Sequence, residues 1–307
     1  YPASRAAVRD QLVEIVKGEG GRPLPQKMAE HEWEERFYPM RLKRLGPSLI
    51  PSEGLVPVDR LASAVRDIQV EAPGIAIEGH MCGRQEMTLL TFLLDDERTA
   101  AFTINFSKSL YVLDAVKRNG GRPYSVGLYL TDEAEAYLGP ERLARYREYK
   151  AKVDPGNLLN PGKILREGDA VAAAIRMARS MRPIVKLAAA VAGKTPGKSS
   201  RLPALIAEEA VTCTRCGYCR NVCTLFSGMK WESASPRGKW NFLRAYDTGK
   251  LPLTQEVVDK FLLCTTCKRC DDVCQVQIPI QALWDDMRGF LIQQKEFMTF
   301  PAFEMMA

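Results

Sequence analysis

The sequence predicts an α+β protein in two parts: a ferredoxin-like split βαβ sheet domain, followed by an all-helical domain rich in cysteine. Three observations lead to this prediction. Between residues 31 and 167, strand-like and helix-like hydrophobic patterns follow one another in the order β-α-β-β-α-β-α, which is typical of such a sheet with helices on one face. Residues 168–204 form a basic linker. Residues 205–307 are helical in pattern and contain eight of the nine cysteines.

Each element of the first domain has its own signal, and residues 1–30 precede it as a connecting segment. Four segments have strand-like composition: residues 55–58, 74–79, 87–94 and 124–130. Three segments have helical character: the one that contains Leu61, Val65 and Ile68, residues 95–118, and one that starts at Thr131. Gly120 and Gly121 end the second helix as a C-cap. Thr131 is placed to cap the third, whose acidic first turn suits the helix dipole.

The composition excludes several classes of protein. No run approaches the roughly eighteen apolar residues of a membrane span, and no secretion signal follows the N-terminus. The chain starts at Tyr1-Pro2 without methionine, which indicates processing or a piece of a larger protein. Clustered cysteines without a secretion signal favour metal ligation over disulfide bonds, so the expected location is a reducing cytoplasm.

The net charge of +6 is unevenly placed along the chain. Nine basic residues and two acidic ones lie between Lys163 and Arg201, which makes this segment a candidate for peripheral contact with anionic lipid at the inner membrane face, or with an acidic partner. A solvated linker accounts for the same residues, and Pro183 and Pro196 favour it. Nucleic-acid binding is not expected, because no aromatic residues are interleaved with the basic ones.

The helical part contains two copies of one cysteine spacing. They are Cys213-x₂-Cys216-x₂-Cys219-x₃-Cys223 and Cys264-x₂-Cys267-x₂-Cys270-x₃-Cys274. This is the ligand run of a two-cluster [4Fe–4S] ferredoxin, in which the fourth cysteine of each run ligates the other cluster. We therefore expect two clusters, the first held by Cys213, Cys216, Cys219 and Cys274, the second by Cys264, Cys267, Cys270 and Cys223. A single run would also suit a zinc site.

The insert between the two runs is longer than in a small free ferredoxin. It contains Trp231, Trp240, Phe242, Leu243 and Tyr246, which predict helices packed between the clusters. The arrangement is similar to the iron–sulfur domain of succinate dehydrogenase and fumarate reductase. It resembles more closely the iron–sulfur subunits of glycolate oxidase and of the heterodisulfide-reductase D type, whose insert has a Ser-Pro-Arg-Gly segment. Here Ser235-Pro236-Arg237-Gly238-Lys239 is that segment. If this segment lies beside a cluster, its basic side chains favour the reduced form of the cluster. A β-turn with Pro236 at its second position explains the same residues equally well.

Three segments of the first domain resemble the C-terminal, substrate-side domain of FAD-linked oxidases of the glycolate oxidase and D-lactate dehydrogenase type. They are Trp33–Pro39, Pro51–Pro57 and, above all, Lys152–Lys163. The resemblance implies that the last segment closes the domain beside the flavin, with Asn160, Pro161, Gly162 and Lys163 near FAD. From the residues alone, the same segment predicts a helix end followed by two turns.

The sequence contains no glycine-rich loop that would hold the FAD phosphates, since Gly18-Glu19-Gly20-Gly21 has no preceding strand. The resemblance therefore implies an FAD site shared with another chain or with a missing N-terminal domain. The partners expected are an FAD-binding subunit or domain and a further redox subunit that accepts or donates electrons.

The catalytic motifs of that oxidase family are mostly absent. Of its first motif, His-x-Gly-Asp-Gly-Asn-x-His, only His80 remains, and Met87 stands at the second histidine. His80 is a candidate base, with a structural histidine as the alternative, and Tyr124 is a candidate hydroxyl donor near the flavin. Cys82 is expected to be a small buried hydrophobe.

Two functions follow from these expectations. The first is the electron-transferring component of an FAD- and iron–sulfur-dependent oxidoreductase, for which the resemblance implies a 2-hydroxy acid such as lactate or glycolate. The second is a non-catalytic electron-transfer and docking module of a larger complex of the heterodisulfide-reductase kind.

Overall fold

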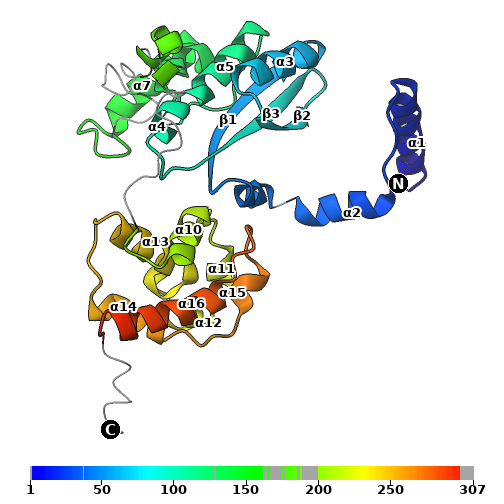
Figure 1. Cartoon of the computed structure of the whole chain (residues 1–307). Helices are drawn as coiled ribbons and strands as arrows, with labels where there is room; N and C mark the ends of the chain where they lie inside the picture. The colour runs from blue at the N-terminus through cyan, green and yellow to red at the C-terminus, as the bar shows by residue number, and fades with distance from the viewer. Residues whose placement is uncertain are drawn as a thin grey trace.

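The computed structural model describes residues 2–36, 38–127, 129–161, 165, 175, 177–184, 187–188 and 200–297. Figure 1 shows a sheet domain above a helical domain, with α1 (Pro2–Gly18) and α2 (Gln26–Glu35) extending to one side. The predicted α+β class, with a helical domain after a sheet domain, is confirmed.

The sheet domain has a four-stranded antiparallel sheet in the order β2-β3-β1-β4. The strands are β1 (Ser48–Pro57), β2 (Ala76–Cys82), β3 (Glu86–Asp95) and β4 (Arg122–Pro123). The helices α3 (Leu61–Glu71) and α5 (Lys108–Arg118) connect β1 to β2 and β3 to β4. Because β3 is antiparallel to both β1 and β2, those two strands are parallel and separated by β3. This is the predicted split βαβ topology.

One face of the sheet is covered by α3 and α5 (Figure 1). Val56 and Leu89 from the strands pack against Ile68, Val112 and Val116 from the helices, and all five are buried. This apolar layer is the core that holds the two helices on the sheet.

The boundaries of two predicted elements are wrong. The helix expected over 95–118 begins later, because the Asp96 side chain accepts a hydrogen bond from the backbone N–H of Arg98 and closes a turn first. It is then divided into α4 (Phe102–Asn105) and α5, and the Ser107 hydroxyl donates to the Ile104 carbonyl at the break. The strand expected at 124–130 is not found in its described residues: β4 ends before it, at Pro123, and Leu130 donates to the Val126 carbonyl, which closes a turn.

The end of α5 and the segment after the turn agree better with the prediction. Gly120 follows α5 with φ of 75°, in the left-handed region, so the predicted glycine C-cap is confirmed. A 3₁₀ turn, η3 (Thr131–Glu133), then leads into α6 (Ala134–Leu138) and α7 (Pro140–Val153). Leu130, not Thr131, occupies the N-cap position of η3, so the predicted cap is wrong.

Short helices joined by loops make up the second domain. They are α10 (Ala204–Thr212), α11 (Tyr218–Asn221), α12 (Thr224–Met229), η4 (Glu232–Ala234), α13 (Pro236–Asp247), α14 (Gln255–Leu262), α15 (Arg269–Asp272), α16 (Ile280–Gly289) and the π-helical turn η5 (Phe290–Gln294). Trp240, Leu243, Phe261 and Trp284 form the centre of its core. Trp231, expected in that core, is 71% exposed.

The short 3₁₀ helix η1 (Pro39–Arg44) ties the start of β1 to the helical domain. The buried Lys43 donates from Nζ to the Val211 carbonyl at 2.7 Å, and Arg44 pairs with Glu209 at 2.7 Å. Arg244 of α13 pairs in turn with Glu97, just after β3. The two domains are therefore joined by polar contacts as well as by the chain.

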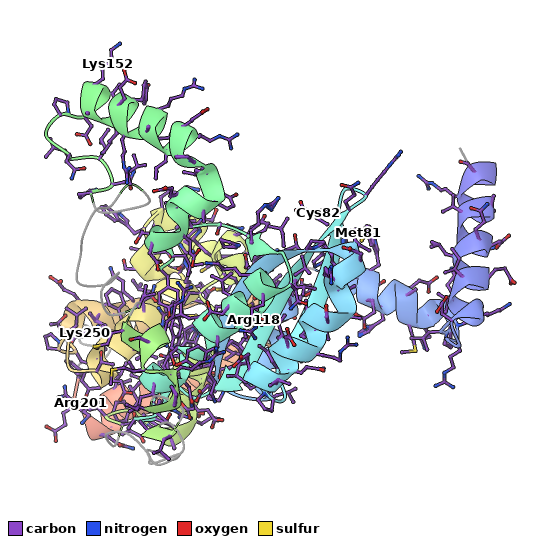
Figure 2. All side chains as sticks on the ribbon, turned by 90° about the horizontal axis from the view of Figure 1, so that it is seen from above. Met81, Cys82, Arg118, Lys152, Arg201 and Lys250 are labelled. Carbon is purple, nitrogen blue, oxygen red and sulfur yellow. The ribbon has the colours of Figure 1, made fainter. Side chains whose placement is uncertain are left out.

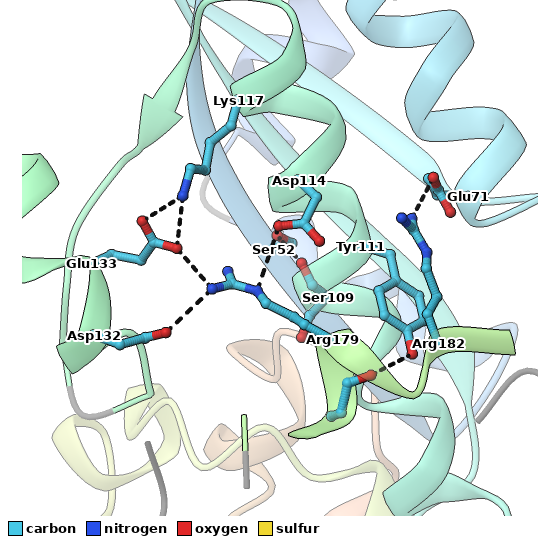
Figure 3. A network of polar contacts seen from close by, with 11 residues as sticks. Ser52, Glu71, Ser109, Tyr111, Asp114, Lys117, Asp132, Glu133, Arg179 and Arg182 are labelled. Carbon is cyan, nitrogen blue, oxygen red and sulfur yellow. Dashed lines mark hydrogen bonds and ion pairs between the residues drawn. The ribbon is translucent and has the colours of Figure 1, made fainter. Parts of the chain in front are cut away.

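Part of the basic linker docks on the sheet domain (Figure 3). Arg179 forms ion pairs with Asp114, Asp132 and Glu133, at 3.4, 3.2 and 2.9 Å. Arg182 pairs with Glu71. A solvated linker is therefore the wrong interpretation for residues 177–184.

Residues 177–180 of this linker are helical. In the part of the chain that the structure describes, no helix combines the length and the apolar character that a membrane crossing needs.

Candidate functional site

The structure brings the eight cysteines of the two runs together around two cavities. Cys213, Cys216 and Cys219 of the first run line one cavity together with Cys274 of the second run. The other is lined by Cys264, Cys267 and Cys270 with Cys223. We call them the 213 cavity and the 264 cavity. This reciprocal grouping agrees with the predicted ligand sets, although ligation itself stays a prediction.

The two cysteine loops have the same backbone shape. In the first, Arg215 and Gly217 have φ of 58° and 89°, and in the second, Thr266 and Lys268 have φ of 52° and 66°. These residues flank the second cysteine of each run on both sides. Alternating right- and left-handed residues fold a short loop into a concave nest of N–H groups, a shape that suits an anionic group.

The fourth cysteine of each run receives backbone hydrogen bonds. Cys223 is the N-cap of α12, and its sulfur accepts from the N–H of Phe226 at 3.5 Å. The Cys274 sulfur accepts from the N–H of Ile278 at 3.3 Å. These hydrogen bonds orient both sulfurs and place N–H dipoles beside them, which suits an anionic sulfur ligand.

Burial has the opposite effect on several of these thiols. It raises the pKa of Cys213 to about 11 and that of Cys219 to about 12, and it also raises the pKa of Cys274. At the exposed Cys267, the N–H of Arg269 lowers the pKa instead. Cys213, Cys219 and Cys274 therefore stay protonated in the metal-free chain, and metal binding at these sulfurs must release their protons.

The donor set fits a polynuclear cluster better than a single ion. Four thiolates around one zinc ion lie about 2.3 Å from it, so they converge on a point. Within the described residues, no three His, Cys, Asp or Glu side chains are grouped in that way. The four sulfurs of each group instead stand around a recess, an arrangement that suits a larger group bound at its corners.

Two buried tryptophans add a second indication that something fills the cavities. Trp240 borders the 213 cavity and Trp284 the 264 cavity, with exposed fractions of 1% and 0%. Neither indole N–H finds a hydrogen-bond acceptor among the described residues. A buried donor without a partner is costly, and cluster sulfur would supply the acceptor. Trp284 was not singled out from the sequence, although it shares a predicted helix with Ile280.

The Ser-Pro-Arg-Gly-Lys segment lies between the two cavities. The Ser235 Oγ accepts from the N–H of Gly238 at 3.0 Å, so Ser235 is the N-cap and Pro236 the first residue of α13. The β-turn interpretation is therefore wrong. Pro236 and Lys239 line the 264 cavity, whereas Arg237 and Trp240 line the 213 cavity.

His80 and Tyr124 are not brought together. His80 lies on the edge strand β2, exposed, with Nε2 3.0 Å from Glu78 Oε1. In the paired rows, His80 faces Thr88, Thr88 faces Leu55 and Leu55 faces Arg122, so His80 and β4 are about 14 Å apart at 4.8 Å per strand. Tyr124 follows β4 and is 48% exposed.

The segment after α7 has the shape that its residues predicted. Asp154, which follows the last residue of α7, accepts from the N–H groups of Leu158 and Leu159 at 2.8 and 2.9 Å. A hydrogen bond from Lys150 lowers the pKa of Asp154. Asn157 and Asn160 have φ of 49°, and these left-handed residues turn the chain twice.

The residues expected beside FAD lie only partly in the described structure. Asn160 and Pro161 are exposed, while Gly162 and Lys163 lie outside the described residues. Figure 2 shows Lys152, at the end of α7, far from Met81 and Cys82 at the tip of the β2–β3 hairpin. The described part of the turn is therefore open to solvent, and a role beside FAD stays a prediction. Cys82, expected to be buried, is exposed, with its sulfur 2.9 Å from Thr88 Oγ1.

Comparisons with known proteins find one family in each part of the chain. Residues 3–164 match the family described as FAD linked oxidases, C-terminal domain, and residues 209–278 match the family described as 4Fe-4S dicluster domain. A probable glycolate oxidase iron-sulfur subunit of Bacillus subtilis (strain 168) is 30% identical over 90 residues, which are 29% of this chain. The match spans only 20% of that protein's length. No solved structure matches the chain.

Proposed function

The chain belongs to the FAD-linked oxidases, whose C-terminal domain it contains together with a 4Fe–4S domain, and from this premise we propose how its electron-transfer role is carried out. The 213 and 264 cavities each hold one [4Fe–4S] cluster through the four cysteines that line them. FAD lies against the turn at Asn160–Lys163, in a site completed by another chain or domain. The substrate is a 2-hydroxy acid such as lactate or glycolate.

The observation that carries the proposal is the reciprocal grouping of the cysteines. Each cavity takes three sulfurs from one run and the fourth from the other. When bound, FAD accepts electron pairs from an organic substrate and the clusters pass electrons on singly. The chain supplies the thiolates, excludes water with Trp240 and Trp284, and positions the clusters through α13, whose first turn borders both cavities.

The experiment is anaerobic purification of the chain, alone and with any flavoprotein that co-purifies. Eight irons, eight inorganic sulfides and no flavin in the isolated chain are expected. Adding the flavin partner and a 2-hydroxy acid should then bleach the visible absorbance of the clusters. A zinc-loaded chain, or one with four irons, contradicts the two-cluster assignment.

A second function, electron transfer and docking without catalysis in this chain, is favoured by the positions of His80 and Tyr124. They are exposed near opposite edges of the sheet, so they do not form one catalytic site by themselves. His80→Gln and Tyr124→Phe distinguish the two functions in the reconstituted complex. A loss of kcat of tenfold or more supports catalysis by these residues, and unchanged kcat supports the docking role.

A further inference from the structure

We propose that Lys239 raises the reduction potential of the cluster in the 264 cavity by holding an unpaired positive charge against it. The inference rests on the proposed function, because it requires that this cavity hold a [4Fe–4S] cluster. It goes further by assigning the control of one cluster, and not the other, to a single side chain.

The burial of Lys239 is the first step of the argument. The residue is 1% exposed, and among the described residues no hydrogen bond or ion pair involves its Nζ. The ammonium lies 5.8 Å from the ring centroid of Phe261 and 5.9 Å from that of Trp284, near the outer limit of a cation–π contact. Two aromatic faces at that range do not replace the hydration of a buried cation, so the site lacks a counter-charge.

The cavity beside it supplies that counter-charge. Lys239 lines the 264 cavity with Cys223, Cys264, Cys267 and Cys270. A [4Fe–4S] cluster with four thiolate ligands is an anion and gains one more negative charge on reduction. A cation fixed beside it in a poorly hydrated site therefore favours the reduced form.

The local fold fixes Lys239 in this position. Residues 236 and 239 are three apart on α13 and face the 264 cavity, while 237 and 240 face the 213 cavity. Gly238 allows the close approach, because a β-carbon there would stand 2.0 Å from the carbonyl oxygen of Glu232. A rotation of α13 that brought Lys239 out to solvent would separate Gly238 from the backbone of Glu232.

Arg237 is the matched contrast at the 213 cavity. Its Nε donates to Glu232 Oε1 at 2.7 Å, and its side chain is 26% exposed. A carboxylate and solvent therefore compensate its charge, and its effect on the neighbouring cluster is smaller. Two other charged residues lie near the 264 cavity, the exposed Lys268 and the partly buried Asp271. Both are kept in the Lys239 variants, so their effect on the cluster potential is the same in wild type and variant.

The test is a redox titration of the full chain, purified anaerobically and followed by electron paramagnetic resonance. In Lys239→Met, the reduction equilibrium of one cluster should fall about tenfold, which is 59 mV for a one-electron couple. The other cluster should keep its potential. Lys239→Arg, which keeps the charge, should stay near the wild-type value, and Arg237→Met should shift the other signal by a smaller amount.

Each outcome decides between the inference and the proposed function. The inference is overturned if Lys239→Met contains both clusters and both keep their wild-type potentials. A wild-type chain that binds no cluster in the 264 cavity overturns the proposed function instead. Lys239→Met could also lose the cluster of the 264 cavity. In that case, a Lys239→Arg variant that keeps this cluster at the wild-type potential supports the role of charge. Loss of the cluster in both variants assigns Lys239 to packing and overturns the inference.

Discussion

Trp240 and Trp284 stack as a tilted pair, with ring centroids 4.5 Å apart and planes at 42°, and each ring borders a different cysteine-lined cavity. The pair is therefore a shared wall between the two cavities. Phe261 packs edge-on against Trp284 at 5.2 Å and extends this wall into the core. The same aromatic layer thus stabilises the helical domain and separates its two sites.

Replacing Trp284 with Ala should lower the free energy of unfolding by about 3–5 kcal/mol, because the large cavity cannot collapse. Trp284→Phe should cost less, since a ring still packs against Trp240. Urea unfolding of the cluster-loaded chain measures both. A Phe variant as unstable as the Ala variant would show that the indole N–H, and not the ring, is the important group.

Cys223→Ala should remove the same cluster as Cys264→Ala, although Cys223 lies in the first run. The cluster associated with Cys213 should persist in both variants. The iron content and the electron paramagnetic resonance signal that remains identify which cluster is lost. Cys82→Ala is the control, because Cys82 is exposed on the sheet and should leave all the iron in place. If Cys223→Ala and Cys213→Ala removed the same signal, the reciprocal grouping would be incorrect.

Gly238→Ala should destabilise the helical domain by at least about 1–3 kcal/mol, since the new methyl group meets the backbone of Glu232 at 2.0 Å. Both clusters should respond, because the first turn of α13 borders both cavities. The control is Gly228→Ala in α12, where a β-carbon meets nothing within 4 Å and helix propensity favours Ala by about 0.5–1 kcal/mol. Thermal unfolding and cluster spectra of the two variants give the comparison.

Glu133→Gln should weaken the sheet domain near neutral pH and matter less in acid. Burial raises the pKa of Glu133, but two hydrogen bonds from Lys117, at 3.0 and 2.8 Å, and the charge of Arg179 lower it more, so its pKa falls below 4.5 (Figure 3). Its contribution is therefore complete above about pH 4.5 and is lost as the pH falls through the lowered pKa. Asp114, whose pKa burial raises, has the opposite slope.

The measurement for this prediction is the difference in unfolding free energy between wild type and Glu133→Gln from pH 7 down to pH 3.5. A difference of about 1–3 kcal/mol at pH 7 should shrink towards the acid end. Loss of clusters in acid is common to both proteins and cancels in the difference. A difference that is constant with pH would mean that the ion pairs with Lys117 and Arg179 do not stabilise the fold.

The sequence predicted the strand order and the cysteine grouping because both depend on spacing along the chain. Apolar periodicity located β1, β2 and β3 but not β4, which precedes the expected strand, and the C-x₂-C-x₂-C-x₃-C runs predicted that the fourth cysteine of each run groups with the other run. Both patterns depend only on residues close together in the sequence, so they can be read without knowing the fold. The late start of the helix after β3 was missed because a single turn, closed by Asp96 and the N–H of Arg98, overrides the helical period.

What the sequence could not predict depends on long-range contacts. The docking of Arg179 requires Asp114 and Asp132, which are distant in the chain, and nothing in the local sequence distinguishes it from a solvated arginine. Lys239 is likewise of a residue type that is usually exposed on a helix, and only the packing of α13 shows that it is buried. Charged side chains are usually exposed, so prediction from residue type favours the wrong environment for both.

The reciprocal sharing of cysteines also has a consequence for how the helical domain assembles. A filled cavity is a cross-link between distant points of the chain, from Cys223 to Cys264 or from Cys213 to Cys274, closing loops of about forty and about sixty residues. Like disulfides over loops of that length, such links remove entropy from the unfolded chain and so stabilise the fold. If each cavity holds the proposed cluster, each link joins both halves of the domain, and iron incorporation should then be coupled to folding.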